Sequence, residues 1–322
     1  VIVPTYNEAS LIEDRLENLK SQNYPRELME VLVVDSSSDG TADIVEEWCR
    51  SKGGMNLRLV REKERRGKLH ALNTALKHTH SASDVIVFTD ADCFWEDGAL
   101  SKVVSYFADS EIGSVTGGIF YTGSEIELGE DMYRDYYNVL RIAESKRHST
   151  PVHNGPLLAI RGEILRKVGL PNYPGSDDSA FGSFIAFMGY RAIQVDDAIV
   201  REPIRGNQFR RKIRRAQHLL LNFLRIKRYA KKMGLYTRSW SFEKIWKMEW
   251  WLHVANPWLL VSSVALLVVS VVLHGSIIAL ALLGTGSLLL ALKMYRIWML
   301  QQVYLVVAAL RNLWIKEEMW SR

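Results

Sequence analysis

The chain has 322 residues, which is enough for one large domain and an appendage. Its formal net charge of +5 is basic without being extreme, and its two cysteines, Cys49 and Cys93, form no metal-ligand pattern. The cysteine content excludes a disulfide-stapled scaffold and favours a reducing compartment. The chain begins without Met inside an apolar stretch and shows no signal peptide, so we expect a few residues to precede it.

Runs that suit buried strands alternate with segments of helical spacing in the front part of the chain. The strand-like runs lie at 1–7, 29–35, 57–62 and 84–92, and the helix-like segments lie between them at 8–24, 36–52 and 67–80. This alternation predicts an α/β fold, in which a mostly parallel, Rossmann-like sheet is flanked by helices. Ligands of such sheets bind beyond the carboxyl ends of the strands.

Two acids, Asp90 and Asp92, end the last of these runs, in "VIVFTDADCFW". Residues i and i+2 of an extended segment point the same way, so the two carboxylates repel each other unless a cation lies near them. Oxygen ligands suit a hard divalent ion such as Mg²⁺ or Mn²⁺, which commonly shares them with substrate phosphates. A solvated turn or a helix cap is the alternative interpretation of this pair taken alone.

Two further motifs place charged side chains beside helical patterns. Lys68 in "RRGKLHALN" stands at an expected helix start, where cations and backbone N–H groups can hold a diphosphate. A solvated basic helix start is the alternative, and the surrounding residues lack the pattern of a P-loop. Asp177 and Asp178 in "GSDDSAF" precede an apolar helix, which indicates either ordinary helix capping or a partly desolvated general base.

The C-terminal part is a different kind of sequence, because two uncharged apolar runs follow each other at 257–273 and 277–292. With their flanks they predict membrane spans at about 255–273 and 277–293, and the mixed segment 296–314 suits a third span or an interfacial helix. A soluble hydrophobic hairpin is the alternative. Lys and Arg flank the pair of runs, which predicts a multi-pass membrane protein with its front domain in the cytoplasm. The runs also offer a surface through which copies of the chain could form a homo-oligomer.

The segment before the apolar runs is strongly basic. Glu202 is the only acid between Arg201 and Arg238, and "QFRRKIRRAQHLLLNFLRIKRYAKK" has the pattern of a basic amphipathic helix. Beside the apolar runs, such a helix favours an anionic membrane surface as its partner, at about 1 kcal/mol for each basic residue near the surface. Binding of nucleic acid is less consistent with the sequence, because base-stacking aromatic residues are not interleaved with the basic ones.

Taken together, the motifs resemble glycosyltransferase family 2, whose members are inverting enzymes with the GT-A fold. They occur in the family's order from residue 1 to about residue 216, as "VIVPTYNE", "VVDSSSDGT", "RRGKLHALN", "TDADCFW", "HNGPLLAIR", "GSDDSAF", "GYRAIQVDDAIVREP" and "RRKIRRAQ". The resemblance implies a nucleotide-sugar donor and a Mn²⁺ or Mg²⁺ cofactor. We expect a GT-A domain at 1–204, basic amphipathic helices at 205–252 and a membrane domain at 253–322.

The resemblance also implies roles for single residues. Asp178 matches the catalytic base, and Asp177 stands where the family has Glu. Asp92 matches the metal-binding acid of the DxD motif, with Asp90 as a second metal ligand or a contact to the ribose. The residues that match donor-binding positions are Pro4, Tyr6, Glu8, Asp35, Lys68, Asp90 and Arg215. Asn154 and Gly155 match positions that receive the donor sugar or the acceptor.

Two departures from the family's pattern bear on specificity. Ser36 stands where uridine-nucleotide enzymes often have a second Asp, which leaves the nucleotide base open. Residues 212–216 lack the Gln and Trp of the QxxRW signature that processive synthases usually keep. We therefore expect single transfer to a lipid-linked acceptor, a polyprenyl or dolichyl phosphate or a glycolipid. A processive polysaccharide synthase and a non-catalytic, nucleotide-binding membrane scaffold are the alternatives.

Overall fold

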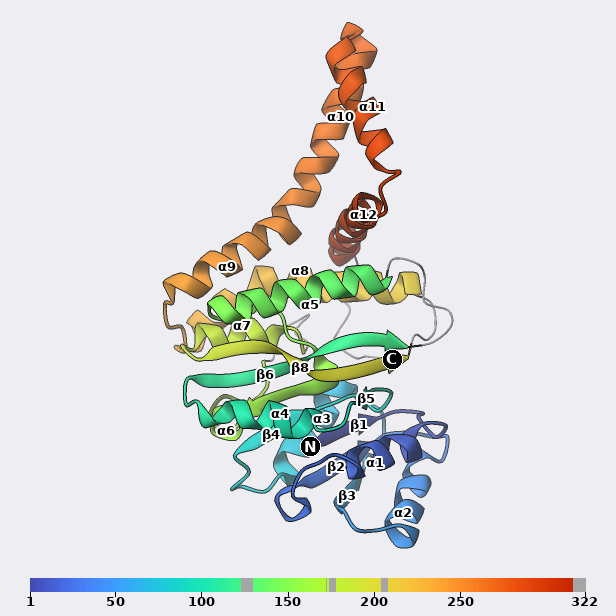
Figure 1. Ribbon diagram of the computed structural model, residues 1–322, viewed down its shortest axis with the longest axis vertical. Coiled ribbons are helices and arrows are strands. Elements are labelled where there is room, and N and C mark those ends of the chain that lie inside the picture. Colours follow the sequence, from blue (N-terminus) through green and yellow to red (C-terminus); the bar gives the residue numbers. More distant parts are fainter. Residues whose placement is uncertain (123–129, 172, 174–177, 204–207, 315–322) are drawn as a thin grey trace.

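The computed structural model describes residues 1–122, 130–171, 173, 178–203 and 208–314, and it confirms an α/β fold. Helices cover both faces of a central sheet with the strand order β3-β2-β1-β4-β7-β6-β8-β5 (Figure 1). The strands are β1 (Ile2–Thr5), β2 (Glu30–Asp35), β3 (Asn56–Arg61), β4 (Val85–Phe88), β5 (Phe94–Trp95), β6 (Ile112–Thr122), β7 (Leu158–Arg161) and β8 (Arg191–Pro203). The helices are α1 (Ile12–Lys20), α2 (Thr41–Ser51), α3 (Lys68–His78), α4 (Ala99–Ser105), α5 (Glu130–Arg147), α6 (Gly162–Val168), α7 (Ala180–Phe187), α8 (Gln208–Lys232), α9 (Trp240–Trp250), α10 (Asn256–His274), α11 (Ile277–Leu289) and α12 (Lys293–Trp314).

The sheet has a parallel half and a mixed half. In the first half, β1 pairs in parallel with β2 and β4, and β2 pairs in parallel with β3. In the second half, β7 runs antiparallel to β4 and β6, while β6 and β8 are parallel to each other. The polar loops that follow β1 and β4 therefore lie at the same edge of the parallel half.

Both faces of the parallel half are buried, which explains why its strands are apolar throughout. Leu32 and Val34 of β2 belong to the core that includes α3, α6 and α7. Val31 and Val33 belong to the core on the other face, with α1, α2 and α4. This alternation is the period of two that an extended strand imposes on its side chains. The two cores fix the ends of β1, β2 and β4, and with them the loops that follow.

The predicted basic helix is present as α8, but its apolar side is covered by protein. Phe223 and Ile226 pack into the core next to α7. Ile213 and Leu220 pack against α12. The apolar side of α8 is thus buried between α7 and α12, and the contact of its basic residues with an anionic membrane surface stays a prediction.

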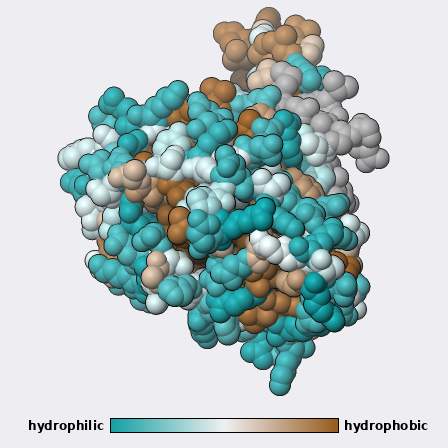
Figure 2. Space-filling model, turned by 60° about the horizontal axis from the view of Figure 1, so that its bottom comes forward, coloured by the Kyte–Doolittle hydropathy of each residue, from teal (hydrophilic) through white to brown (hydrophobic). Residues whose placement is uncertain are grey.

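The apolar hairpin projects from the domain, and its side chains form the hydrophobic knob at the top of Figure 2. One continuous helix runs from Trp240 to His274 through a π-helical turn. Its most apolar 18 residues have a mean hydropathy of 2.1, and only 6% of them are buried. Among the described residues, it is the one helix that is long and apolar enough to cross a membrane by itself.

The two other predicted spans differ from the expectation. α11 has 13 residues, which reach about 20 Å, less than the hydrocarbon core of about 30 Å. α12 then turns away from α11 by 106° and lies along α8. In the described part of the chain, α11 and α12 are long and apolar enough to cross a membrane only if they count together as one bent pair. Separate second and third crossings are therefore not supported.

Candidate active site

A cavity of about 1110 Å³ lies at the carboxyl ends of β1 and β4 and extends to α5, α8 and α12. A site for one small molecule usually has roughly 300–1,000 Å³, so this cavity has room for more than one substrate. Asp35 does not line the cavity, and Asp177 lies outside the described residues. The remaining residues that the sequence predicted for the site do line it, namely Pro4, Tyr6, Glu8, Lys68, Asp90, Asp92, Asn154, Gly155, Asp178 and Arg215.

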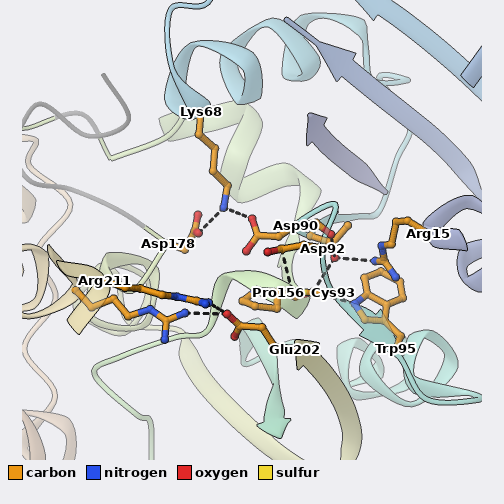
Figure 3. Close-up of polar contacts among 12 residues, drawn as sticks. Arg15, Lys68, Asp90, Asp92, Cys93, Trp95, Pro156, Asp178, Glu202 and Arg211 are labelled. Carbon is orange, nitrogen blue, oxygen red and sulfur yellow. Dashed lines mark hydrogen bonds and ion pairs between the residues drawn. The ribbon is translucent and has the colours of Figure 1, made fainter. Parts of the chain in front are cut away.

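Lys68 connects two acids from distant parts of the chain. Its Nζ atom donates to Asp90 Oδ1 at 2.5 Å and to Asp178 Oδ2 at 2.7 Å (Figure 3). Burial alone would lower the pKa of Lys68, but the charges of Asp178 and Asp90 outweigh it and hold that pKa above its usual value. Burial disfavours the ionised form of Asp90. The charge of Lys68 outweighs that effect and holds the pKa of Asp90 below its usual range. Lys68 therefore remains a cation between two carboxylates.

Asp90, Asp92 and Cys93 form a group that could hold a metal ion, with ligand atoms that all lie within 4.8 Å of one another. The Cys93 thiol donates a hydrogen bond to Asp92 Oδ1 at 3.6 Å. Burial, followed by the charges of Asp90 and Asp92, raises the pKa of Cys93 well above its usual value, so the sulfur stays a neutral thiol. The charged donors are two carboxylates, which fit a hard ion such as Mn²⁺ or Mg²⁺ rather than a soft one.

Asp178 lies directly against the backbone of Gly155. A Cβ atom built on Gly155 would stand 2.7 Å from Asp178 Cγ, closer than side chains approach each other. The Asp178 side chain is 15% exposed, and its carboxylate points toward Lys68 and Asp90 (Figure 3). The loop before β7 thus makes room for this carboxylate at the wall of the cavity.

The loop after β2 is held together by Asp35. Its carboxylate accepts hydrogen bonds from Thr5 Oγ1 and Ser37 Oγ, both at 2.6 Å, and from the Ser37 amide at 3.1 Å. Asp35 is 3% exposed, and its neighbour Ser36 lines the cavity instead. In this arrangement the predicted donor-binding acid organises the loops after β1 and β2.

The loop that carries Asp90 and Asp92 is held in place by contacts on the side away from the cavity. Arg15 of α1 is fully buried and donates from Nη2 to Thr89 Oγ1 at 2.7 Å, and its guanidinium lies over the Trp95 ring. Thr89 Oγ1 and Trp95 Nε1 both donate to the Pro156 carbonyl, at 2.7 Å and 2.8 Å. These bonds tie Asp90 and Asp92 to the segment that contains Gly155 (Figure 3).

Arginines converge on the opposite wall. Glu202, which ends the sheet domain, pairs with Arg211 and with Arg215 of α8, the latter at 3.0 Å. The Tyr121 hydroxyl accepts from Arg215 Nη1 at 2.9 Å and from Arg134 Nη2 at 2.6 Å. Burial raises the pKa of Tyr121, but the charges of Arg134, Arg215 and Arg211 lower it to about 7. This wall of the cavity therefore favours negative charge.

Sequence reasoning missed Tyr121, Arg134, Arg141 and Glu202, which all line the cavity. Arg134 and Arg141 are seven residues apart on α5, so they lie on one helix face, two turns from each other. Their spacing in "YRDYYNVLR" was the available signal, but the sequence alone does not show that α5 covers the site.

The family model described as glycosyl transferase family 2 matches residues 1–169 of the chain. Among solved structures, a mannosyltransferase from Pyrobaculum calidifontis in complex with GDP-Man and Mn²⁺ is 43% identical, with a TM-score of 0.83. The match covers 98% of this chain and 87% of the mannosyltransferase.

Two curated relatives are similar over shorter stretches. Glycosyltransferase AglE of Haloferax volcanii is 32% identical over 176 residues, which are 54% of this chain and 56% of AglE. A Methanococcus voltae protein named dolichyl N-acetyl-alpha-D-glucosaminyl phosphate 3-beta-D-2,3-diacetamido-2,3-dideoxy-beta-D-glucuronosyltransferase is 29% identical over 33% of each chain. The matched part of this chain thus spans about half of AglE and a third of the Methanococcus protein.

Proposed function

Because the chain belongs to glycosyl transferase family 2, we propose that it is a metal-dependent, inverting glycosyltransferase with a lipid-linked acceptor. It would take a sugar from a nucleotide-sugar donor and add it to the acceptor at the cytoplasmic face of a membrane. The observation that carries this proposal is the position of Lys68, which joins a metal-binding acid and a candidate base in one cavity.

GDP-mannose is the first donor to test, and Mn²⁺ the first metal. Support comes from the Pyrobaculum calidifontis mannosyltransferase, which was solved with both and is 43% identical over nearly the whole of this chain. Ser36, rather than an acid, lines the cavity after β2, which is consistent with a base other than uracil. Tyr6 and Arg65 stack at the same end of the cavity, with the guanidinium 3.7 Å from the ring centre.

The proposed reaction is a direct displacement. An acceptor oxygen attacks the anomeric carbon while the bond from that carbon to the diphosphate oxygen breaks, so the anomeric configuration inverts. Asp178 accepts the proton of the acceptor hydroxyl. Asp90 and Asp92 would hold a divalent ion, which supplies positive charge to the leaving diphosphate when bound. Lys68 and Arg215 add fixed positive charge at the same cavity.

The acceptor proposal rests on the apolar hairpin and on one relative. The helix that ends at His274 is long enough to enter a bilayer, and α12 lies between that hairpin and the cavity. The name of the Methanococcus voltae relative includes a dolichyl phosphate compound. We therefore propose the division into a GT-A domain at 1–204, connecting helices at 205–252 and a membrane domain at 253–322, with anionic lipid headgroups beside the basic residues.

The test uses the full chain in detergent with a membrane lipid extract as acceptor. Radiolabelled sugars from GDP and UDP donors are supplied with Mn²⁺, with Mg²⁺ or with a chelator, and the products are separated by length. The proposal expects one added sugar, metal dependence and the largest transfer from GDP-mannose. A ladder of products would indicate a processive synthase. Tight nucleotide binding without transfer from any donor would indicate a non-catalytic scaffold.

The Asp92→Ala variant tests the position of the metal site independently of the transfer assay. The change removes one of the two carboxylates that fit the ion, so Mn²⁺-dependent binding of GDP should weaken strongly, while binding without metal should change little. Isothermal titration with GDP, with and without Mn²⁺, measures both. Equal Mn²⁺ dependence in the variant and the parent would place the ion elsewhere.

A further inference from the structure

The wall of the cavity formed by α5 carries positive charge. Arg134 and Arg141 both line the cavity. Their guanidinium groups donate to oxygens other than carboxylates, Arg134 to the Tyr121 hydroxyl at 2.6 Å and Arg141 to Asn154 Oδ1 at 2.5 Å. Within the described residues, neither arginine forms an ion pair, whereas Arg211 and Arg215 share Glu202. Arg134 Nε is also buried without a hydrogen-bond partner.

Two like charges on one wall are unfavourable, and a bound anion would offset that cost. Arginine keeps its charge at any physiological pH, and both side chains are half-buried. Burial and then the like charge of Arg134 lower the pKa of Arg141, so the two guanidiniums repel each other across this part of the cavity. An anionic group bound between them would relieve that repulsion and accept hydrogen bonds from the remaining N–H groups.

Two acids, Glu144 and Glu249, lie near Arg141 and favour its charged form. Burial, with the carboxylate of Glu249 as the next cause, raises the pKa of Glu144 to about 8, so Glu144 is largely neutral at pH 7. Glu249 shares its surroundings with His253, whose Nδ1 lies 3.4 Å from Glu249 Oε2. The imidazole of His253 also contacts the Tyr137 hydroxyl at 3.2 Å. Glu249 and His253 thus line the cavity beside Arg141, in a polar cluster with Glu144.

Apolar side chains also line the cavity, among them Leu252 of the π-helical turn and Ile297, Leu300 and Leu305 of α12. α12 follows directly on the hairpin of α10 and α11, which is the most apolar part of the molecule (Figures 1 and 2). A ligand that fills this space would have an anionic head at α5 and an apolar chain that leads to the membrane.

We propose that Arg134 and Arg141 form a subsite for the phosphate or diphosphate group of an amphiphilic acceptor, separate from the metal site that receives the donor. Asn154 positions Arg141, because its Oδ1 accepts from Arg141 while its Nδ2 donates to Gly117 O and Gln194 Oε1, both at 3.1 Å. Asn154 also precedes Gly155, against which Asp178 lies. The subsite therefore places the acceptor's head group beside the candidate base. The inference rests on the proposed function.

The test measures binding of geranyl diphosphate to the full chain in detergent, with the donor site saturated by GDP and Mn²⁺. Inorganic pyrophosphate, which has only the anionic group, and geraniol, which has only the apolar chain and a hydroxyl group, are measured for comparison. Arg134→Gln and Arg141→Gln remove the charges, and Arg147→Gln makes the same change on the exposed end of α5. Arg141→Lys keeps a charge in case the Gln variant fails to fold, which thermal unfolding would reveal.

We expect Arg134→Gln and Arg141→Gln each to weaken geranyl diphosphate binding at least about tenfold, with a smaller loss in Arg141→Lys. Arg147→Gln should bind like the parent, and GDP affinity should be the same in all variants. Geraniol and pyrophosphate should each bind more weakly than geranyl diphosphate. Unchanged geranyl diphosphate binding in both Gln variants would overturn the subsite.

The other outcomes separate this inference from the proposed function. A loss of GDP affinity in Arg134→Gln and Arg141→Gln would assign these arginines to the donor's diphosphate and overturn the acceptor subsite. Pyrophosphate binding as tight as that of geranyl diphosphate would overturn the amphiphilic ligand. A parent protein that binds no nucleotide with Mn²⁺ would instead contradict the proposed function itself.

Discussion

The carboxylate of Asp178 occupies the space in which a side chain on Gly155 would begin, with Asp178 Cγ only 2.7 Å from that position. The two residues are 23 positions apart and come from different loops. Their contact holds the candidate base at 2.7 Å from Lys68, beside the acids that follow β4. The position of this carboxylate therefore depends on the absence of a side chain at residue 155.

Gly155→Ala should impair transfer much more than folding. The added methyl group displaces Asp178, and a shift of about 1 Å at a reacting group can cost about a hundredfold in rate. We expect such a loss in the transfer rate, with Mn²⁺-dependent GDP binding close to that of the parent. Gly284→Ala is the matched control, because nothing lies within 4 Å of the added Cβ. Unimpaired transfer by Gly155→Ala would contradict the positioning of Asp178.

Lys68→Met should separate metal binding from transfer. Without the ammonium group, Asp90 and Asp178 lose their shared cation, and the leaving diphosphate loses a positive charge. We expect transfer to fall about a hundredfold, while Mn²⁺ binds at least as tightly because a repelling charge is gone. Lys77→Met, on the exposed end of the same helix, is the control. Paramagnetic resonance of bound Mn²⁺ and a transfer assay give the two readouts, and loss of both together would contradict this separation.

Much of this arrangement could be predicted from the sequence, because its residues belong to local patterns. Asp90 and Asp92 follow an apolar strand, and Lys68 begins a helix after a glycine. Each position can be read from neighbouring residues, and the order of strands and helices then brings them to one edge of the sheet. The match to the family covers this part of the chain.

The rest depends on contacts between distant segments. Arg134 and Arg141 are ordinary charged residues of a helix until α5 is packed over the cavity. Asp35 stands at a strand end like a ligand-binding acid, and the hydrogen bonds that its carboxylate accepts from Thr5 and Ser37 appear only in the folded chain. The turn of 106° between α11 and α12 accompanies the packing of α12 along α8, a contact between distant segments that hydropathy does not reveal.

Tyr121 should make stability depend on pH. Its pKa is lowered from 10.0 to about 7 in the folded chain, so between these values the unfolded chain binds more protons and stability rises with pH. This contribution is fully present above the unfolded pKa and is lost as the pH falls through about 7.

Tyr121→Phe should therefore flatten the rise in unfolding temperature between about pH 6 and about pH 9. Tyr136→Phe, which changes an exposed residue of α5, should keep the slope of the parent. Unfolding followed by intrinsic fluorescence in detergent compares the three proteins. Parallel curves for Tyr121→Phe and the parent would show that the arginines do not ionise this phenol.

Arg15→Met should destabilise the domain and loosen the loop that holds Asp90 and Asp92. Burial lowers the pKa of Arg15 to about 10, and its guanidinium bonds to Thr89 and Asn18. Removal deprives Thr89 Oγ1 and Asn18 Oδ1 of a charged donor and removes the contact with the Trp95 ring, which we expect to cost about 3 kcal/mol in the free energy of unfolding. Arg50→Met is the control on an exposed side chain. A change below about 1 kcal/mol would contradict the anchoring role.

Asp178→Asn tests the central claim, that Asp178 takes the proton of the acceptor beside the metal-bound donor. The measurement is transfer of mannose from GDP-mannose with Mn²⁺ by the full chain, together with GDP affinity in the same preparation. Asn keeps the shape of the side chain but cannot accept the proton, so we predict that transfer falls by about a thousandfold while GDP binds nearly as in the parent. Transfer close to that of the parent would contradict the account.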